Sequence, residues 1–227
     1  MLLDLLLPRR CVVCSRLGVA LCGACRAALP RLRGPGCARC GAPTAWPVLR
    51  CLECSGRRLA FASARAAVAY EGPVRPLVSA WKERGQRALA HEAADVIANN
   101  VERPSVAALT FVPPDGDRSV KRGYHPAEQL AGDLGRLWCL PLLGALGRTR
   151  APKRQRGLSL AERRRNVAGS FAATGRVAGT VALVDDVYTT GSTASAAASA
   201  LRRAGARRVE VVTFARAVRS IESMQRS

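Results

Sequence analysis

Eight of the nine cysteines in this 227-residue chain form four C-x-x-C pairs, all within its first quarter. A C-x-x-C turn places two thiolates on one side of a tight knuckle, and two knuckles complete a tetrahedral shell of four sulfurs around zinc. The pairs therefore predict two structural zinc sites, because protein sulfur fills every ligand position and leaves none open for a substrate. The predicted metal ligands are Cys11, Cys14, Cys22, Cys25, Cys37, Cys40, Cys51 and Cys54.

The gaps between the pairs bear on which knuckles share an ion. Seven residues separate the first pair from the second and ten separate the third from the fourth, and both gaps fit a short ribbon-like loop. We expect sequential pairing, with an interleaved cross-brace as the alternative. A segment this short buries little apolar core unaided, so bound zinc would supply folding free energy.

The charge and composition of the chain limit its partners. Its apolar content of 48% is enough for a folded core, and its net charge of +20 favours polyanionic or phosphorylated partners. Part of that charge also follows from an Arg- and Ala-rich composition of the kind that GC-rich coding produces. Aromatic residues make up only 4% of the chain, which argues against a broad base-stacking platform for single strands.

Membrane insertion is not expected, because no segment approaches the roughly 18–20 apolar residues of a span. The start of the chain, MLLDLLLPRRC, lacks the basic n-region of a secretory signal. Residues 2–7 are expected to form a short amphipathic helix. We expect a cytoplasmic protein.

Beyond a polar, basic link at residues 55–60, strand-like and helix-like segments alternate, which predicts an α/β fold with a parallel sheet covered on both faces. We expect a zinc-binding domain over residues 1–58 and an α/β domain over 59–227. The expected strands are residues 65–70, 106–113, 140–148, 181–184 and 207–217. The expected helices are residues 72–85, 86–101, 125–138, 159–166 and 193–205. Cys139, in an apolar context, is expected to be a buried structural thiol.

The stretch VALVDDVYTTGST at residues 181–193 contains the main candidate site. A buried strand runs into Asp185 and Asp186, and a loop of small polar residues then opens a helix. The free N–H groups of that helix suit a phosphate, and Gly191 lets the backbone approach an anion closely. Carboxylates would repel a phosphate placed on them but accept hydrogen bonds from hydroxyl groups. A ribose 5-phosphate would fit the stretch, with its phosphate at the loop and its hydroxyl groups at the aspartates.

The stretch is not a P-loop, since G-K-[ST] is missing, and it is not a Rossmann fingerprint, since only one glycine is present. The stretch instead resembles the ribose-phosphate signature of type I phosphoribosyltransferases. The chain as a whole resembles the ComF family, phosphoribosyltransferase-like proteins linked to natural competence and DNA uptake. That resemblance covers nearly the whole chain and is carried by the N-terminal knuckles and, in order, by YEGPVRPLVSAWKERG, RGYHPAEQLA, LSLAERRRNVAGSF and VDDVYTTGST.

The resemblance implies a type I phosphoribosyltransferase-like fold and phosphoribosyl pyrophosphate as the ligand, bound with magnesium. It implies that Asp185 and Asp186 hold the ribose 2- and 3-hydroxyls and that Lys82 faces the pocket, although Lys82 also fits a solvated helix end. It implies that the 5-phosphate is wrapped by Thr189, Thr190, Gly191, Ser192 and Thr193.

Two further segments carry basic residues. Residues 122–125, RGYH, would close over a ligand, read a base, or cap the helix that follows. The basic stretch from Arg150 to Arg165 resembles a flexible loop near the pyrophosphate, with a solvated face and a DNA-contacting strip as alternatives. One departure from the family lies at VPPDGDRSVKRGY, where acids at residues 115 and 117 oppose pyrophosphate binding.

Three functions follow from these observations. The first is an active phosphoribosyltransferase of nucleotide metabolism or salvage, for which no catalytic base or acceptor is identified. The second is a ribose-phosphate-binding protein of DNA uptake, with single-stranded DNA and a helicase-type protein as partners. The third is an adaptor that has lost its ligand, which the intact stretch at residues 185–193 argues against.

Overall fold

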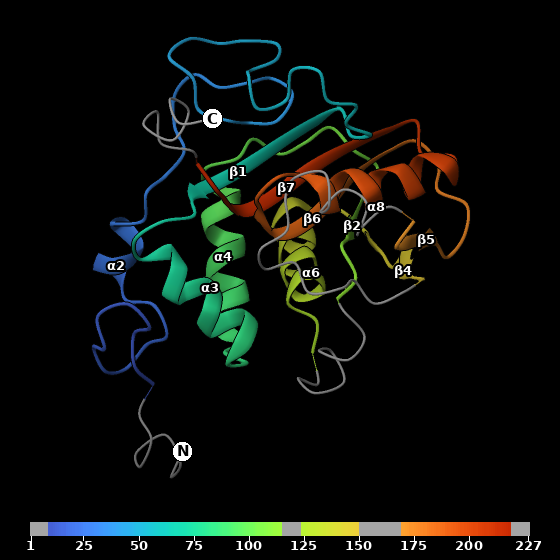
Figure 1. The fold of residues 1–227 in the computed structure, drawn as a ribbon. Coiled ribbons are helices and arrows are strands. Elements are labelled where there is room, and N and C mark those ends of the chain that lie inside the picture. Colours follow the sequence, from blue (N-terminus) through green and yellow to red (C-terminus); the bar gives the residue numbers. More distant parts are fainter. Residues whose placement is uncertain (1–8, 115–123, 150–168, 219–227) are drawn as a thin grey trace.

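A five-stranded parallel sheet forms the centre of the protein (Figure 1). The computed structural model describes residues 9–114, 124–149 and 169–218. The strands lie in the order β1-β7-β6-β2-β3. Their bounds are Ser63–Ala69 for β1, Ala108–Phe111 for β2, Leu142–Leu143 for β3, Thr180–Tyr188 for β6 and Arg208–Arg216 for β7.

Helices cover both faces of this sheet, as the alternating pattern predicts. Along β6, Ala182 and Val184 pack into the core formed with α3 (Val74–Glu83), α4 (Ala88–Ala98) and α6 (Pro126–Trp138). Val181 and Leu183 point to the other face and pack with α8 (Ser192–Arg203). Alternate residues of a strand point to opposite faces, so an apolar run is required where both faces are buried. The predicted α/β class, with a parallel sheet, flanking helices and a cysteine-rich N-terminal part, is confirmed.

The single strand expected at residues 140–148 is wrong, because the chain divides there between two sheets. Residues Leu142–Leu143 form the short edge strand β3 beside β2. After Gly144 the chain turns away, and β4 (Leu146–Arg148) pairs antiparallel with β5 (Phe171–Ala173). Leu146 is buried while both β3 leucines are exposed, so the two halves of the apolar run have different environments.

The cysteine-rich segment forms two ribbons that pack against opposite faces of the sheet. The first, residues 11–27, ends in the short helix α2 (Gly23–Ala27) and shares a core with α3 and α4. The second, residues 37–54, shares its core with α8. In Figure 1 the first ribbon, in dark blue, lies beside α3, and the second, in lighter blue, lies at the top beyond β1. The boundary at residues 58 and 59 stays a prediction.

Cys139 is exposed, so its expected burial is wrong. Trp138, the last residue of α6, takes the buried position, and Cys139 caps the helix with a left-handed φ of 53° that turns its side chain outward. The expected helices at residues 2–7 and 159–166 lie outside the described residues. Within the described ranges, no helix has the length and apolarity needed to cross a bilayer.

Candidate functional site

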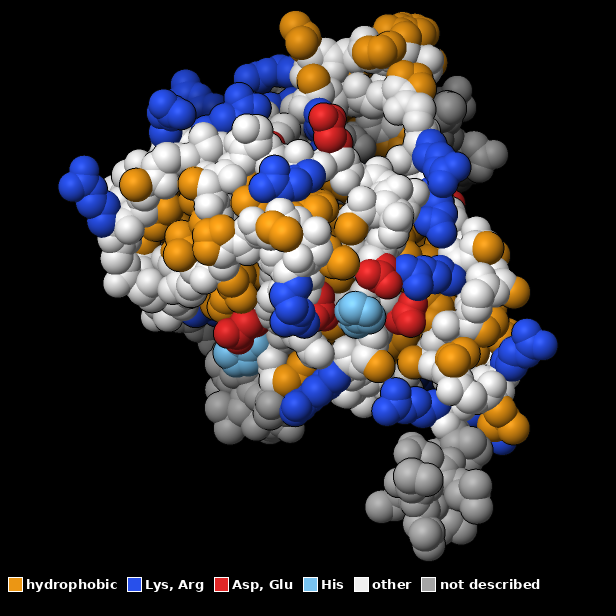
Figure 2. Space-filling view, turned by 180° about the vertical axis from the view of Figure 1, so that it is seen from behind, with side chains coloured by type: hydrophobic (Ala, Val, Ile, Leu, Met, Phe, Trp, Pro, Cys, Tyr) orange, Lys and Arg blue, Asp and Glu red, His pale blue; other side chains and the backbone are white. Residues whose placement is uncertain are grey.

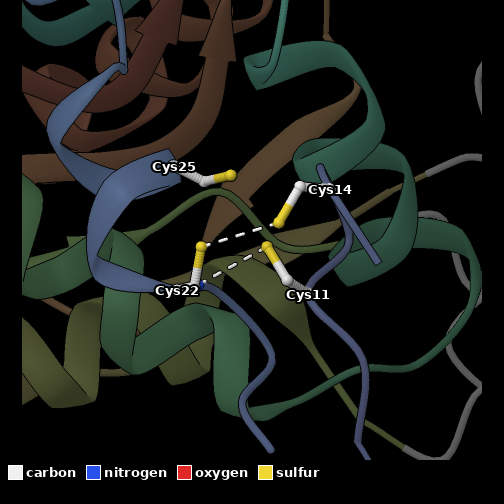
Figure 3. Close-up of side chains that lie close together, drawn as sticks. All are labelled: Cys11, Cys14, Cys22 and Cys25. Carbon is white, nitrogen blue, oxygen red and sulfur yellow. Dashed lines mark hydrogen bonds between the residues drawn. The ribbon is translucent and has the colours of Figure 1, made fainter. Parts of the chain in front are cut away.

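The eight predicted metal ligands form two compact clusters. In each cluster all four Sγ atoms lie within 4.8 Å of one another, and the thiols of the first cluster converge on one centre (Figure 3). The Sγ atoms of Cys14 and Cys22 are 3.6 Å apart, and those of Cys37 and Cys54 are 3.5 Å apart. A tetrahedral zinc with bonds of about 2.3 Å spaces its sulfurs by about 3.8 Å, so both clusters fit the ion.

The clusters also decide the pairing. Cys11, Cys14, Cys22 and Cys25 form one cluster, and Cys37, Cys40, Cys51 and Cys54 form the other. The sequential pairing is confirmed and the interleaved alternative is wrong. Four thiolates around each centre leave no open position, so these are structural zinc sites.

Asp185 and Asp186 lie at the carboxyl end of β6, within the strand rather than after it. The strand continues past them because β7 pairs with it as far as Tyr188 and Arg216. On the other side of β6, the last residue of β2, Phe111, pairs with Val184. The two aspartates therefore lie where β6 extends past the end of β2, at the carboxyl edge of a parallel sheet, which is where such sheets bind ligands.

Lys82, in the last turn of α3, lies next to the aspartate pair. Its Nζ is 2.6 Å from Oδ2 of Asp186, whose side chain is only 7% exposed. The carboxylates also bond locally: the Asp186 N–H donates to Oδ1 of Asp185 at 2.9 Å, and the Val187 N–H donates to Oδ1 of Asp186 at 2.7 Å. The structure thus brings together Lys82, Asp185 and Asp186, and the Lys82 side chain is 40% exposed beside the buried carboxylate of Asp186.

Asp185 carries an unusual proton affinity. Burial removes water from its carboxylate, and this desolvation together with the charge of Asp186 raises the pKa of Asp185 to about 7. The positive charges of Lys82 and Arg148 act in the opposite direction. Arg148, in β4, has no sequence signal that marks it as a site residue, because only the turn between β3 and β4 carries it there.

The loop after β6 is shaped by the ring of Tyr188. Gly191 has a φ of 71°, and a Cβ there would lie 2.9 Å from Cε2 of Tyr188 and closer still to its oxygen. Only glycine fits this position. Thr190 and Ser192 share a hydrogen bond of 2.9 Å between their hydroxyls, and α8 begins at Ser192. The Ser192 N–H donates to Oγ1 of Thr190 at 3.3 Å, and the positive dipole end of α8 lies directly beyond the aspartates along the chain.

The other predicted segments are only partly described. The Tyr124 hydroxyl donates to the Trp81 carbonyl, and the Arg87 guanidinium lies 5.1 Å from the centre of the Tyr124 ring. These contacts place Tyr124 against the end of α3, one residue from Lys82. Residues 115–123 and 150–168, which contain the acidic loop and the whole basic stretch, lie outside the described residues.

The first prediction concerns zinc. The full chain purified under reducing conditions should carry two zinc ions, because two four-thiolate clusters have the required spacing. Native mass spectrometry measures the stoichiometry. A metal-free protein whose eight thiols alkylate freely would contradict both sites, and a single ion would remove one of them.

The second prediction concerns Asp185. Its pKa of about 7 exceeds the unfolded value of about 3.9, so the protonated group stabilises the fold below about pH 4 and this contribution is lost as pH rises to about 7. Asp185→Asn should therefore raise the free energy of unfolding relative to the wild type, and by more at about pH 8 than at about pH 5.5. Urea denaturation at both pH values measures this difference, with the exposed Glu102→Gln as the control. An equal effect of Asp185→Asn at both pH values would contradict it.

Comparisons with known proteins agree with this architecture. A family model described as a double zinc ribbon domain matches residues 2–56. Competence protein F of Haemophilus influenzae is 28% identical, over 92% of this chain and 97% of that protein. DNA utilization protein YhgH of Salmonella typhimurium is 31% identical, over 91% of this chain and 96% of that protein.

Among solved structures, a glutamine phosphoribosylpyrophosphate amidotransferase from B. subtilis, complexed with ADP and GMP, is 24% identical with a TM-score of 0.37. It covers 55% of this chain, and this chain covers 26% of it. The full-length relatives and the double zinc ribbon decide the assignment: the chain belongs to the ComF family, together with Competence protein F and YhgH.

Proposed function

We propose that this protein binds phosphoribosyl pyrophosphate, or a related ribose phosphate, and acts in natural competence or DNA uptake. The observation that carries the ligand proposal is the pair of carboxylates at the carboxyl end of β6, followed directly by a small-residue loop and the start of α8. The names of the relatives, Competence protein F and DNA utilization protein, support the biological role.

The loop would bind the 5-phosphate of the ligand. Thr189, Thr190, Gly191, Ser192 and Thr193 offer backbone amides and hydroxyl donors, and the dipole of α8 favours an anion at its start. The first turn of α8 contains no acidic residue that would repel the phosphate.

The carboxylates would bind the ribose. Asp186, and Asp185 once it has lost its proton, would accept hydrogen bonds from the 2- and 3-hydroxyls, because an ionised carboxylate is acceptor-only. Lys82, which balances Asp186 in the structure, would keep this pair compatible with the negative charges of the diphosphate. Magnesium binds through one or two carboxylates together with substrate phosphates, so this donor set fits a magnesium ion that enters with the ligand.

Transfer chemistry is the alternative within the same site. A phosphoribosyltransferase of nucleotide metabolism or salvage would displace pyrophosphate with a nitrogen nucleophile, and no residue is assigned as its base. Release of pyrophosphate on addition of a nucleobase would favour this alternative over a binding protein. Four-thiolate zinc sites suit a reducing compartment, so we propose that the protein is cytoplasmic.

The third prediction tests the ribose site. Asp186→Asn should weaken phosphoribosyl pyrophosphate binding in the presence of magnesium by about ten- to a hundredfold, the usual effect of losing a charge-assisted hydrogen bond. Isothermal calorimetry measures the affinity. Glu102→Gln, which removes the same charge at the opposite edge of the sheet, is the control. Equal affinities in the wild type and Asp186→Asn would remove Asp186 from the site, and no binding by the wild type would refute the ligand.

A second observation favours a nucleic-acid partner. A groove of about 890 Å³ opens at the amino ends of β1 and β7, the edge of the sheet away from the aspartates. Arginine side chains outnumber acidic ones in its lining, where the acidic residues are Glu102 and Glu210. The basic lining residues are Arg33, Arg39, Arg50, Arg65, Arg103 and Arg208. Figure 2, which views the molecule from behind, shows several Lys and Arg side chains, in blue, on that face. We propose that this groove binds the phosphates of single-stranded DNA.

The fourth prediction tests this groove. The double variant Arg33→Ala/Arg50→Ala should weaken single-stranded DNA binding and reduce the magnitude of the salt slope by about 0.7 per lost phosphate contact. Fluorescence anisotropy with labelled strands at several salt concentrations measures both effects. Arg58→Ala/Arg75→Ala removes the same charge from exposed positions that do not line the groove. Equal losses in the two double variants would assign binding to overall charge.

A further inference from the structure

The segment that follows the second ribbon is bonded to the phosphate loop. Arg57 donates from Nη2 to the carbonyl oxygen of Thr190 at 2.5 Å, and from Nη1 to the carbonyl oxygen of Glu53 at 3.3 Å. Glu53 lies between the metal ligands Cys51 and Cys54. One half-buried guanidinium therefore joins the fourth knuckle to the loop that would hold the 5-phosphate.

A second contact from the same segment reaches α8. The Ala60 N–H donates to Oγ of Ser195 at 3.1 Å, in the first turn of the helix whose start would bind the phosphate. Ala60 and Arg57 thus contact the two sides of the loop, Ser195 after it and Thr190 within it.

A buried arginine connects the same ribbon to the floor of the loop. Arg216, the last residue of β7, is 1% exposed, and its Nη2 lies 2.6 Å from Oε2 of Glu53. It also donates to the Cys40 carbonyl, and its guanidinium lies 4.9 Å from the centre of the Tyr188 ring. A buried charge without a partner is very costly, and Glu53 is the acidic partner of Arg216. The position of Glu53 on the knuckle therefore affects the stability of the end of β7. Tyr188 in turn packs under Gly191.

The first ribbon is attached elsewhere. Arg26 forms ion pairs of 3.1 Å with Glu92 and Asp95 of α4, and Cys11 and Cys22 pack into the core on the α3 and α4 face. Among the described residues, the hydrogen bonds and ion pairs found for the first ribbon do not involve the phosphate loop. The two zinc clusters have the same kind of ligands, but their ribbons contact different parts of the fold.

We infer that the second zinc ribbon positions the phosphate loop, and that Arg57 is the positioning residue that links them. Zinc at the second cluster would fix the backbone of Cys40 and Glu53. The hydrogen bonds of Arg57 and Arg216 to these residues then restrict the motion of residues 188–195. The first cluster has no such role. This inference rests on the proposed function for its effect on ligand affinity, but the coupling itself exists without a ligand.

Hydrogen exchange of the amides in residues 189–195, in the zinc-loaded full-length protein, tests the coupling directly. Arg57→Ala should speed exchange by about tenfold, the effect of losing one charge-assisted hydrogen bond. The matched control is Arg58→Ala, which removes the same charge from an exposed neighbour and should leave exchange unchanged. Equal exchange in the two variants would overturn the inference.

A second pair of variants compares the clusters. Cys51→Ser and Cys14→Ser each remove one thiolate, and only Cys51→Ser should speed exchange in residues 189–195. Equal effects of the two on the loop would overturn the role of the second cluster. If Cys51→Ser does not fold, Arg57→Ala still decides the matter, because it leaves all eight thiolates in place.

Calorimetry with ribose 5-phosphate extends the test to affinity. Arg57→Ala should weaken binding by about tenfold, Arg58→Ala should not, and Arg57→Lys should recover part of the loss because an ammonium can still donate to Thr190. A wild type that binds neither ribose 5-phosphate nor phosphoribosyl pyrophosphate with magnesium would refute the proposed function, while the exchange measurement would still decide the coupling. Unchanged affinity in Arg57→Ala, with a wild type that binds, would overturn the inference.

Discussion

The parallel pairing of β6 with β7 is the constraint on which the rest of the structure depends. Both strands are nine residues long, and they pair from Thr180 and Arg208 to Tyr188 and Arg216. This pairing buries an apolar run on both faces and keeps β6 extended past the end of β2. The same pairing places the two aspartates, the Tyr188 ring and the Arg216 guanidinium at one edge of the sheet, so the candidate site and its support have a common origin.

Two adjacent carboxylates at a partly buried strand end are unfavourable by themselves, because each loses water and each repels the other. The protein offsets this in two ways: Lys82 pairs with Asp186, and Asp185 holds its proton up to about neutral pH. A carboxyl pKa raised by burial and by a neighbouring charge is typical of functional positions, which agrees with the site that we propose.

The two zinc ribbons resemble each other in sequence but pack on opposite faces of the sheet. The first is bonded to α4, the second is bonded to the end of β7, and the segment that follows the second is bonded to the start of α8. The ribbon segment therefore lies against the sheet on both sides rather than standing apart from it. This packing gives a physical reason for a small cysteine-rich part to accompany an α/β fold, since it supports elements that carry the candidate site.

The sequence alone determined the α/β class, the eight cysteine ligands of two zinc sites and the stretch at residues 181–193, because each depends on local spacing: alternation of apolar segments, C-x-x-C turns, and a strand followed by a loop and a helix. It favoured sequential pairing of the knuckles, and the structure decided it. Only the tertiary structure decided the rest. It divided residues 140–148 between two sheets, turned Cys139 outward, and brought Arg57, Arg148 and Arg216 to the loop and the aspartates. These side chains are isolated arginines in an arginine-rich chain, and local spacing cannot distinguish them. Their partners, such as Thr190 for Arg57 and Glu53 for Arg216, lie more than a hundred residues away and become neighbours only when β6 and β7 pair and the second ribbon packs against them.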